Sequence, residues 1–252
     1  MATLLILGSK PDPLLPPQRG FDAMACANAS GRSAARLGLP DPTYTVMTSV
    51  LTSGHKPAND LALEALRGLR TGTLYLYPRP PSQSFLLKRL VREIRTIRVK
   101  PWYFKRRLHA LGYRFDRFVA PPRAFYHDLV LRLCDHDAAI AAQIRRKQPS
   151  TGMVALALGL ATAGFDRFVM SGFSFEITHA YAHNPLIDRL GTTRSKHADT
   201  DVAVLRCLAH RHGNIYTTEP SVHERADVPL LEAKGVSETT VRHADAREIA
   251  TG

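Results

Sequence analysis

Short apolar runs that alternate with helical patterns are the feature of this sequence that most constrains its fold. The first run, Thr3–Leu7, has the length of a buried strand and is followed directly by Gly8. Further strand-like runs are predicted at residues 23–27, 44–48, 73–77, 168–171 and 214–216, and helical patterns at 32–37, 60–69, 123–148, 151–163 and 199–210. Strands that are separated by helices form parallel sheets. We therefore predict an α/β fold, a Rossmann-like doubly wound sheet that is mainly parallel.

One domain is predicted to hold most of the chain. The 252 residues are enough for one large domain, and we expect it to span 1–230, with a polar tail over 231–252. The strand and helix pattern breaks at Pro78, so we expect a basic helical insertion over about 79–122. Residues of about 173–197 read as a long loop, and loops of more than about 15 residues are usually lids or are disordered. We expect a flexible lid there.

The net charge of +12 is concentrated in one stretch. Between Lys88 and Arg117 there are eleven basic residues and two acidic ones, interleaved with aromatic residues such as Trp102 and Phe115. This mixture is typical of a solvated helical face, of a surface that docks on anionic lipid or glycan, and of a nucleic-acid-binding patch. The sequence leaves all three interpretations open.

The cysteines and the apolar runs indicate a cytoplasmic protein. Cys26, Cys134 and Cys207 are odd in number and have no CxxC spacing, which favours reduced structural thiols. No apolar run approaches the roughly 20 residues that a membrane span needs, and the first residues lack the basic start of a signal peptide. We expect a cytoplasmic protein, with a peripheral position at the inner membrane and a homo-oligomer as open alternatives.

Three turns are candidate ligand-binding sites. Ser150-Thr151-Gly152 opens an apolar helix, whose free N–H groups and positive dipole end suit a phosphate or carboxylate. Gly8-Ser9 follows the first strand, and in doubly wound sheets ligands bind over the carboxyl ends of strands. Asn28 follows the second strand. The alternatives are structural, since Ser150 or Asn28 can simply cap a helix and a turn after a strand often needs a glycine.

His197 is the candidate general base. It precedes a predicted helix, and a helix N-terminus favours the neutral imidazole that can accept a proton. His179 and His183 lie in the preceding loop, but the spacing of the three is not a known zinc pattern. Asp-x-Asp pairs at 135–137 and 199–201 could bind a divalent metal ion. Both pairs lie in or at the start of predicted helices, however, and alternate helical positions do not share a face. We therefore expect no metal. The chain also lacks GxGxxG, Walker A and GxSxG motifs, which disfavours nicotinamide cofactors, ATP and hydrolase chemistry.

The segment from Pro149 onward resembles a known family. Residues 149–152 with their apolar helix, followed by 168–173, resemble the S motif of sialyltransferases. The continuation through 171–175 and 180–182, and then His197 before Thr200-Asp201, is similar to the bacterial sialyltransferases that act on lipooligosaccharide. The resemblance covers about 149–220. The front of the chain matches only at 4–8 and Asn28, and residues 78–148 are unmatched.

The resemblance implies a Rossmann-like nucleotide-sugar-binding domain that works without a metal or other cofactor. It implies inverting transfer of a sialic-acid-like sugar from a CMP donor to a glycan or glycolipid, in lipopolysaccharide or capsule biosynthesis. His197 matches the general base of the family. Residues matched or expected to bind the donor are Gly8, Ser9, Asn28, Ser150, Thr151, Gly152, Ser174 and Tyr181, with Tyr181 holding the leaving phosphate.

Three departures from the family pattern leave the identity of the donor sugar open. Ser9 stands where the family usually has Asn, and Glu176 stands where it has a second phosphate-binding Tyr. Asp201 lies four residues after His197, whereas the acidic residue of the family lies five after its His. A CMP-Kdo or other nonulosonate transferase is thus an alternative. An alternative that is not an enzyme is a basic nucleic-acid-binding protein without catalytic activity.

Overall fold

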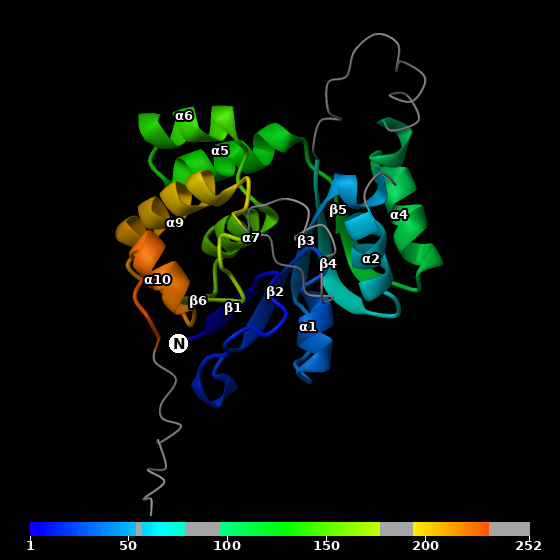
Figure 1. The fold of residues 1–252 in the computed structure, drawn as a ribbon, viewed down its shortest axis with the longest axis horizontal. Helices are drawn as coiled ribbons and strands as arrows, with labels where there is room; N and C mark the ends of the chain where they lie inside the picture. The colour runs from blue at the N-terminus through cyan, green and yellow to red at the C-terminus, as the bar shows by residue number, and fades with distance from the viewer. Residues whose placement is uncertain (54–56, 79–95, 177–193, 232–252) are drawn as a thin grey trace, which may run out of the picture.

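The sheet is doubly wound and parallel, as predicted. The computed structural model describes residues 1–53, 57–78, 96–176 and 194–231. Within these residues, seven parallel strands run in the order β5-β4-β3-β2-β1-β6-β7 (Figure 1). The strands are β1 (Thr3–Leu7), β2 (Ala23–Ala27), β3 (Tyr44–Thr48), β4 (Arg70–Tyr77), β5 (Arg114–Val119), β6 (Arg167–Ser171) and β7 (Ile215–Thr217).

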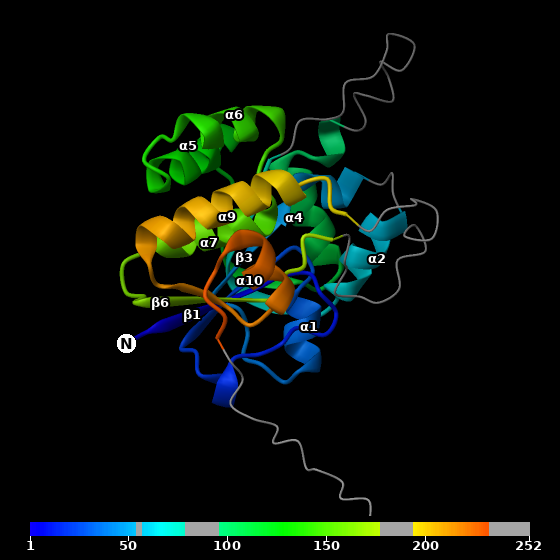
Figure 2. The same ribbon diagram turned by 60° about the vertical axis from the view of Figure 1, so that its left-hand side comes forward.

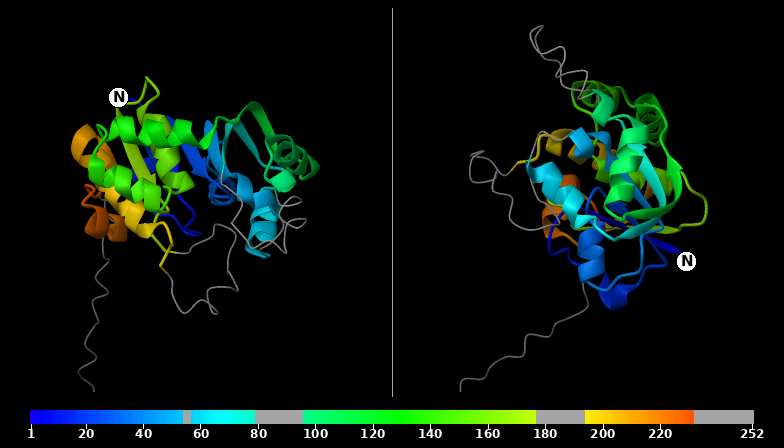
Figure 3. Two further views of the ribbon diagram at one scale, coloured as in Figure 1. Left: turned by 90° about the horizontal axis from the view of Figure 1, so that it is seen from above. Right: turned by 90° about the vertical axis from the view of Figure 1, so that its right-hand side faces the viewer.

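Helices cover both faces of the sheet. Figure 2 shows α7 and α9 above the sheet, with α5 and α6 outside them, while α1 lies below. In Figure 3, α10 and α4 lie at opposite ends of the molecule, in line with the edge positions of β7 and β5. The helices are α1 (Gly31–Arg36), α2 (Pro57–Ala65), α4 (Pro101–Ala110), α5 (Arg123–Leu133), α6 (Ala138–Arg146), α7 (Thr151–Leu160), α9 (Ala198–His212) and α10 (Pro220–Ala226), with short 3-10 turns η1 (Pro17–Arg19) and η2 (Ser49–Ser53).

The apolar pattern of β1 explains the two layers. Successive side chains of a strand point to opposite faces, so Leu4 and Ile6 join the core under α7 while Leu5 and Leu7 join the core on the α1 side. Helix α7 is apolar almost all round and nearly every residue of it is buried, as a helix covered on several sides must be. It lies so close to the sheet that a Cβ on Gly159 would come within 2.5 Å of Leu4 Cδ2.

The expected basic insertion contains an edge strand that was not predicted. Residues 101–110 are helical as expected, but Arg114–Val119 form β5, which pairs in parallel with β4. A half-exposed edge strand does not need an apolar run. The basic residues of β5 therefore gave no strand signal in the sequence. From Pro101 onward, the segment is therefore a further helix–strand unit of the sheet. Its first part, through Arg95, lies outside the described residues.

The single long helix predicted over 123–148 is wrong. Helix α5 ends at Leu133 and α6 begins at Ala138. Asp135 and His136 between them have positive φ angles of 54° and 53°, which a helix cannot contain. Asp137 then caps α6 by accepting bonds from the amides of Ala139 and Ile140 at 2.8 and 3.0 Å. The Asp135-His136-Asp137 sequence is thus a helix break.

The end of the described chain adds helix α10, which the sequence did not reveal. Pro220 stands in its first turn, where its missing N–H costs no hydrogen bond. Beyond it, Leu230 forms a bridge with Thr217 of β7. The greater part of the expected lid, 177–193, and the tail from 232 onward lie outside the described residues.

Strand order determines where a ligand site is expected. The chain runs outward from β1 through β2 to β5 and then returns to add β6 and β7 on the other side of β1. The direction of winding therefore reverses between β1 and β6. In open α/β sheets, ligands bind in the crevice outside the carboxyl ends of the strands at such a reversal.

Candidate functional site

Asn28 joins three elements at the carboxyl edge of the sheet. It follows β2 directly and has a φ of 53°, a conformation that Asn tolerates better than most residues. Its Nδ2 donates to Thr151 Oγ1 at 2.8 Å, and its Oδ1 accepts from the Thr48 amide at 3.0 Å. Asn28 therefore does not cap α1. It ties the ends of β2 and β3 to the first residue of α7.

The turn before α7 lies at this edge, and it opens the apolar helix as predicted. Ser150 is the N-cap of the helix, and its Oγ accepts a long 3.5 Å bond from the Met153 amide. The Ser150 amide donates to Asp201 Oδ1 at 2.8 Å. The cap interpretation of Ser150 is therefore present in the structure, and the residue is already engaged through both its side chain and its amide.

Close packing against Gly172 and Phe173 accounts for two of the candidate glycines. A Cβ on Gly152 would come within 2.3 Å of Phe173 Cε1, and one on Gly8 within 3.0 Å of Phe173 Cδ2. Gly8 also lies against the backbone of Gly172, whose carbonyl oxygen would be 2.3 Å from such a Cβ. Both glycines are thus required by close packing against Gly172 and Phe173 after β6, and they allow β1, β6 and α7 to lie close together.

Two buried polar atoms beside Asn28 and His197 have no hydrogen-bond partner among the described residues. They are Thr48 Oγ1, at the end of β3, and Gln148 Nε2, two residues before Ser150. Buried polar groups are satisfied in the great majority of cases, and an unsatisfied one calls for a water, an ion or a ligand. Sequence reasoning missed both. A search for polar residues at every strand end would have found Thr48.

His197 is buried beside the α7 turn. It is 7% exposed and precedes α9. Its Nδ1 lies 2.9 Å from the carbonyl oxygen of Gln148, and since a carbonyl can only accept, Nδ1 must carry the proton. In the neutral ring the lone pair is then on Nε2. The hydrogen bond fixes both the tautomer and the orientation of the imidazole.

The two aspartates at the start of α9 have different partners. Asp201 is 6% exposed and accepts the Ser150 amide, whereas the exposed Asp199 pairs with Arg194. Both carboxylates also lie in the first turn of α9, where the positive end of the helix dipole stabilises their negative charge. Among the residues that the structure describes, no group of three or more His, Cys, Asp or Glu side chains is arranged to hold a metal.

The remaining predicted residues lie in the loops after β1 and β6 or outside the described chain. Ser9 follows Gly8 and is half-buried. Ser174 Oγ accepts a 3.3 Å bond from the Glu176 amide, inside the loop after β6. Tyr181, His179 and His183 belong to 177–193 and lie outside the described residues.

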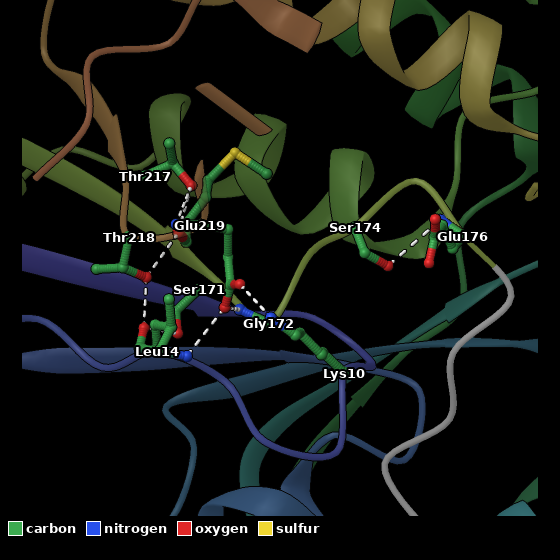
Figure 4. A network of polar contacts seen from close by, with 10 residues as sticks. Lys10, Leu14, Ser171, Gly172, Ser174, Glu176, Thr217, Thr218 and Glu219 are labelled. Carbon is green, nitrogen blue, oxygen red and sulfur yellow. Dashed lines mark hydrogen bonds and ion pairs between the residues drawn. The ribbon is translucent and has the colours of Figure 1, made fainter. Parts of the chain in front are cut away.

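A buried carboxylate on the other side of the reversal was not anticipated. Glu219, just after β7, has a side chain that is 1% exposed. Its Oε1 accepts the amides of Leu14 and Gly172, each at 2.9 Å, and its Oε2 lies 2.6 Å from Lys10 Nζ (Figure 4). The contacts of Glu219 with Lys10 and Leu14 join residues more than 200 positions apart, so no local sequence pattern predicts them.

The shifted pKa values of Cys26 and His127 limit the roles that these two groups can have. Burial raises the pKa of the Cys26 thiol to about 12, which makes it a structural thiol and not a nucleophile. Burial, with Arg123 nearby, lowers the pKa of His127, whose Nε2 lies 3.1 Å from the hydroxyl of Tyr77 at the end of β4.

Comparisons with known proteins give similarity at the level of structure. No family model and no curated protein matches the chain. The sialyltransferase CstII from Campylobacter jejuni with the substrate analogue CMP-3FNeuAc is 13% identical, with a TM-score of 0.49 over 92% of this chain and 87% of that one. Its complex with trisaccharide acceptor and CMP is 12% identical, with a TM-score of 0.48 over 93% and 89%.

An alpha-2,3-sialyltransferase from Campylobacter jejuni in apo form is also similar, at 13% identity and a TM-score of 0.48 over 93% of this chain and 83% of that one. These identities and scores describe a likeness in the course of the backbone. The chemistry of the site is therefore argued from the side chains of this chain.

Proposed function

We propose that this chain is a glycosyltransferase of the sialyltransferase type, which transfers a sialic-acid-like sugar from a CMP donor to a glycan without a metal. One observation carries the proposal. Three segments that the sequence motifs singled out, around Asn28, Thr151 and His197, meet at the carboxyl edge of the sheet. A doubly wound sheet binds nucleotides at that edge.

The polar groups there fit a nucleotide better than a packed core. Thr48 Oγ1 and Gln148 Nε2 are buried polar atoms without a partner among the described residues. The Thr48 amide is bonded to Asn28, and the Gln148 carbonyl is bonded to His197. A ligand with hydroxyl, carbonyl and phosphate oxygens would satisfy both buried atoms. Two buried polar atoms so close to the motif residues support a polar ligand at this position.

His197 has the geometry of a general base. Its Nδ1 proton is held by the Gln148 carbonyl, so Nε2 is the nitrogen able to accept a proton. In the reaction, the bond from the anomeric carbon to the CMP phosphate oxygen breaks and a bond to the acceptor oxygen forms. The acceptor hydroxyl proton passes to Nε2, and CMP leaves with the electron pair of the broken bond.

The basic surface over α4 and β5 supports an anionic acceptor or membrane. Lys105, Arg106 and Arg107 are exposed on α4, beside Trp102, whose side chain is 58% exposed. Such a surface would hold the enzyme near anionic, lipid-linked glycans. No helix among the described residues is both long and apolar enough to cross a bilayer.

Turnover of the donor tests the proposal. The purified chain is incubated with CMP-sialic acid and a lipooligosaccharide glycan in EDTA, and released CMP is measured. We expect CMP release that is coupled to sugar transfer and is unchanged by EDTA. Release that requires added Mn²⁺, or no release with either CMP-sialic acid or CMP-Kdo, would refute the proposal.

A further inference from the structure

The buried carboxylate of Glu219 holds one ammonium group at the carboxyl edge of the sheet. A carboxylate that is withdrawn from water needs several donors or a counter-charge. Glu219 has both: the amides of Leu14 and Gly172 on Oε1, and Lys10 Nζ on Oε2 (Figure 4). Its charge is thereby compensated by protein groups, with almost no contact with solvent.

The loop after β1 is held in place without the ammonium. The Lys10 amide donates to the Gly172 carbonyl at 2.9 Å, and the Leu14 carbonyl accepts from Ser171 Oγ at 2.6 Å and from Thr218 Oγ1. The Leu14 amide is bound to Glu219 as well. Because backbone and hydroxyl groups already connect this loop to β6 and β7, the Lys10 side chain is not required for the connection.

Lys10 has the accessibility that Glu219 lacks. Its side chain is 34% exposed, against 1% for Glu219. An ammonium group has three N–H donors, and the Glu219 contact uses one. Lys10 lies two residues after Gly8, beside the reversal between β1 and β6 where a ligand is expected. Of the two side chains, Lys10 and not Glu219 is therefore the one that a ligand approaching this edge can reach.

We infer that Lys10 contacts an anionic group of the nucleotide-activated donor, and that Glu219 is the residue that positions it. The inference rests on the proposed function and adds a cation that the family resemblance did not supply. The anionic group is either the phosphate of the nucleotide or the carboxylate of an acid sugar. The same contact serves both, so the ligands used in the test must separate them.

Affinities of three ligands provide the test, measured by calorimetry in EDTA. Cytidine has neither anion, CMP has the phosphate, and a non-transferable CMP-sialic acid analogue has both. Lys10→Met alone would strand a buried charge on Glu219 and could unfold the chain. We therefore use Lys10→Met with Glu219→Gln, which removes both charges while the amide oxygen can still accept the two backbone bonds. Lys10→Arg is the matched control that keeps the cation.

The double variant should bind cytidine as the parent does and CMP at least about tenfold more weakly, because a hydrogen bond to a charged group is lost. Lys10→Arg should retain most of the affinity. A loss seen only with the donor analogue would assign the contact to the sugar carboxylate. Equal affinities of parent and double variant for both anionic ligands would overturn the inference alone. A parent that binds none of the three ligands would overturn the proposed function and the inference together.

Discussion

His197 is the residue on which the proposed chemistry depends most. Removing a general base typically costs about a hundredfold to ten-thousandfold in rate, so His197→Ala should lose transfer by that factor. CMP affinity should stay near that of the parent, since the imidazole is held by Gln148 and is assigned to the acceptor proton. Initial rates with CMP-sialic acid and calorimetry with CMP measure the two quantities.

The control is His210, an exposed histidine near the end of α9, the helix that His197 precedes. His210→Ala should change neither rate nor affinity. If His197→Ala keeps more than about a tenth of the parental turnover, His197 only stabilises the junction between α9 and the α7 turn, and the base must be sought elsewhere.

Thr48 gives a prediction in which stability and binding move in different directions. Thr48→Val replaces a buried hydroxyl that has no partner among the described residues, so the melting temperature should stay or rise. If the hydroxyl binds the ligand, CMP affinity should fall about two- to tenfold. Thr48→Ser keeps the hydroxyl and should keep the affinity. A valine variant that binds CMP as tightly as the parent would remove Thr48 from the site.

At this scale, the sequence was a good guide to which residues gather and a poor guide to what they bond. Asn28, Thr151 and His197 were singled out, and the structure brings their segments together. The pairing of Asn28 with Thr151 spans 123 positions, and no spacing rule encodes such a contact. Gly8 and Gly152 were proposed as donor-binding residues with a structural alternative, and close packing against Gly172 and Phe173 gives a reason for each glycine that needs no ligand.

Helix α6 depends on its cap. Asp137 accepts two amides at the start of the helix, so Asp137→Ala should lower the free energy of unfolding by about 1 kcal/mol. Denaturant unfolding measures the change. Asp128→Ala, at an exposed position on α5, is the control and should shift stability by less than about 0.5 kcal/mol. An equal effect of the two substitutions would mean that the cap contributes nothing beyond surface charge.

The basic surface of α4 has its own test. Arg106→Glu with Arg107→Glu should release the chain from anionic vesicles at low salt, because each basic residue near such a surface contributes on the order of 1 kcal/mol. Arg145→Glu with Arg146→Glu on α6 makes the same charge change away from this surface. Co-sedimentation that is lost equally in both variants would show that net charge, and not the α4 surface, drives association.

Element boundaries followed the local signals closely where the strands are buried. Runs such as Thr3–Leu7 and Ala23–Ala27 match the predicted strands, because central parallel strands are apolar on both faces. The exposed edge strand β5 lacks that signal and was missed. The break between α5 and α6 was missed because the apolar spacing continues across it, while only the backbone angles of Asp135 and His136 show the interruption.

The whole molecule brings its chemistry to one edge by the order of its strands. Residues after β1, β2, β6 and β7 and the last residue of β3 meet there, together with the first turns of α7 and α9. Alternation of strands and helices predicts such an edge, since parallel strands all end on the same side. It does not predict which strands are neighbours, so the Lys10–Glu219 pair across β1 and β7 became visible only in the fold.

The central claim is that this edge binds a CMP-activated sugar, and nucleotide selectivity tests it most directly. Calorimetry of the full chain in EDTA compares CMP with UDP and GDP. We predict saturable binding of CMP, at least about tenfold tighter than that of UDP or GDP, with no change when Mn²⁺ replaces EDTA. Equal affinities for the three nucleotides, binding that appears only with Mn²⁺, or no binding of CMP would contradict the account.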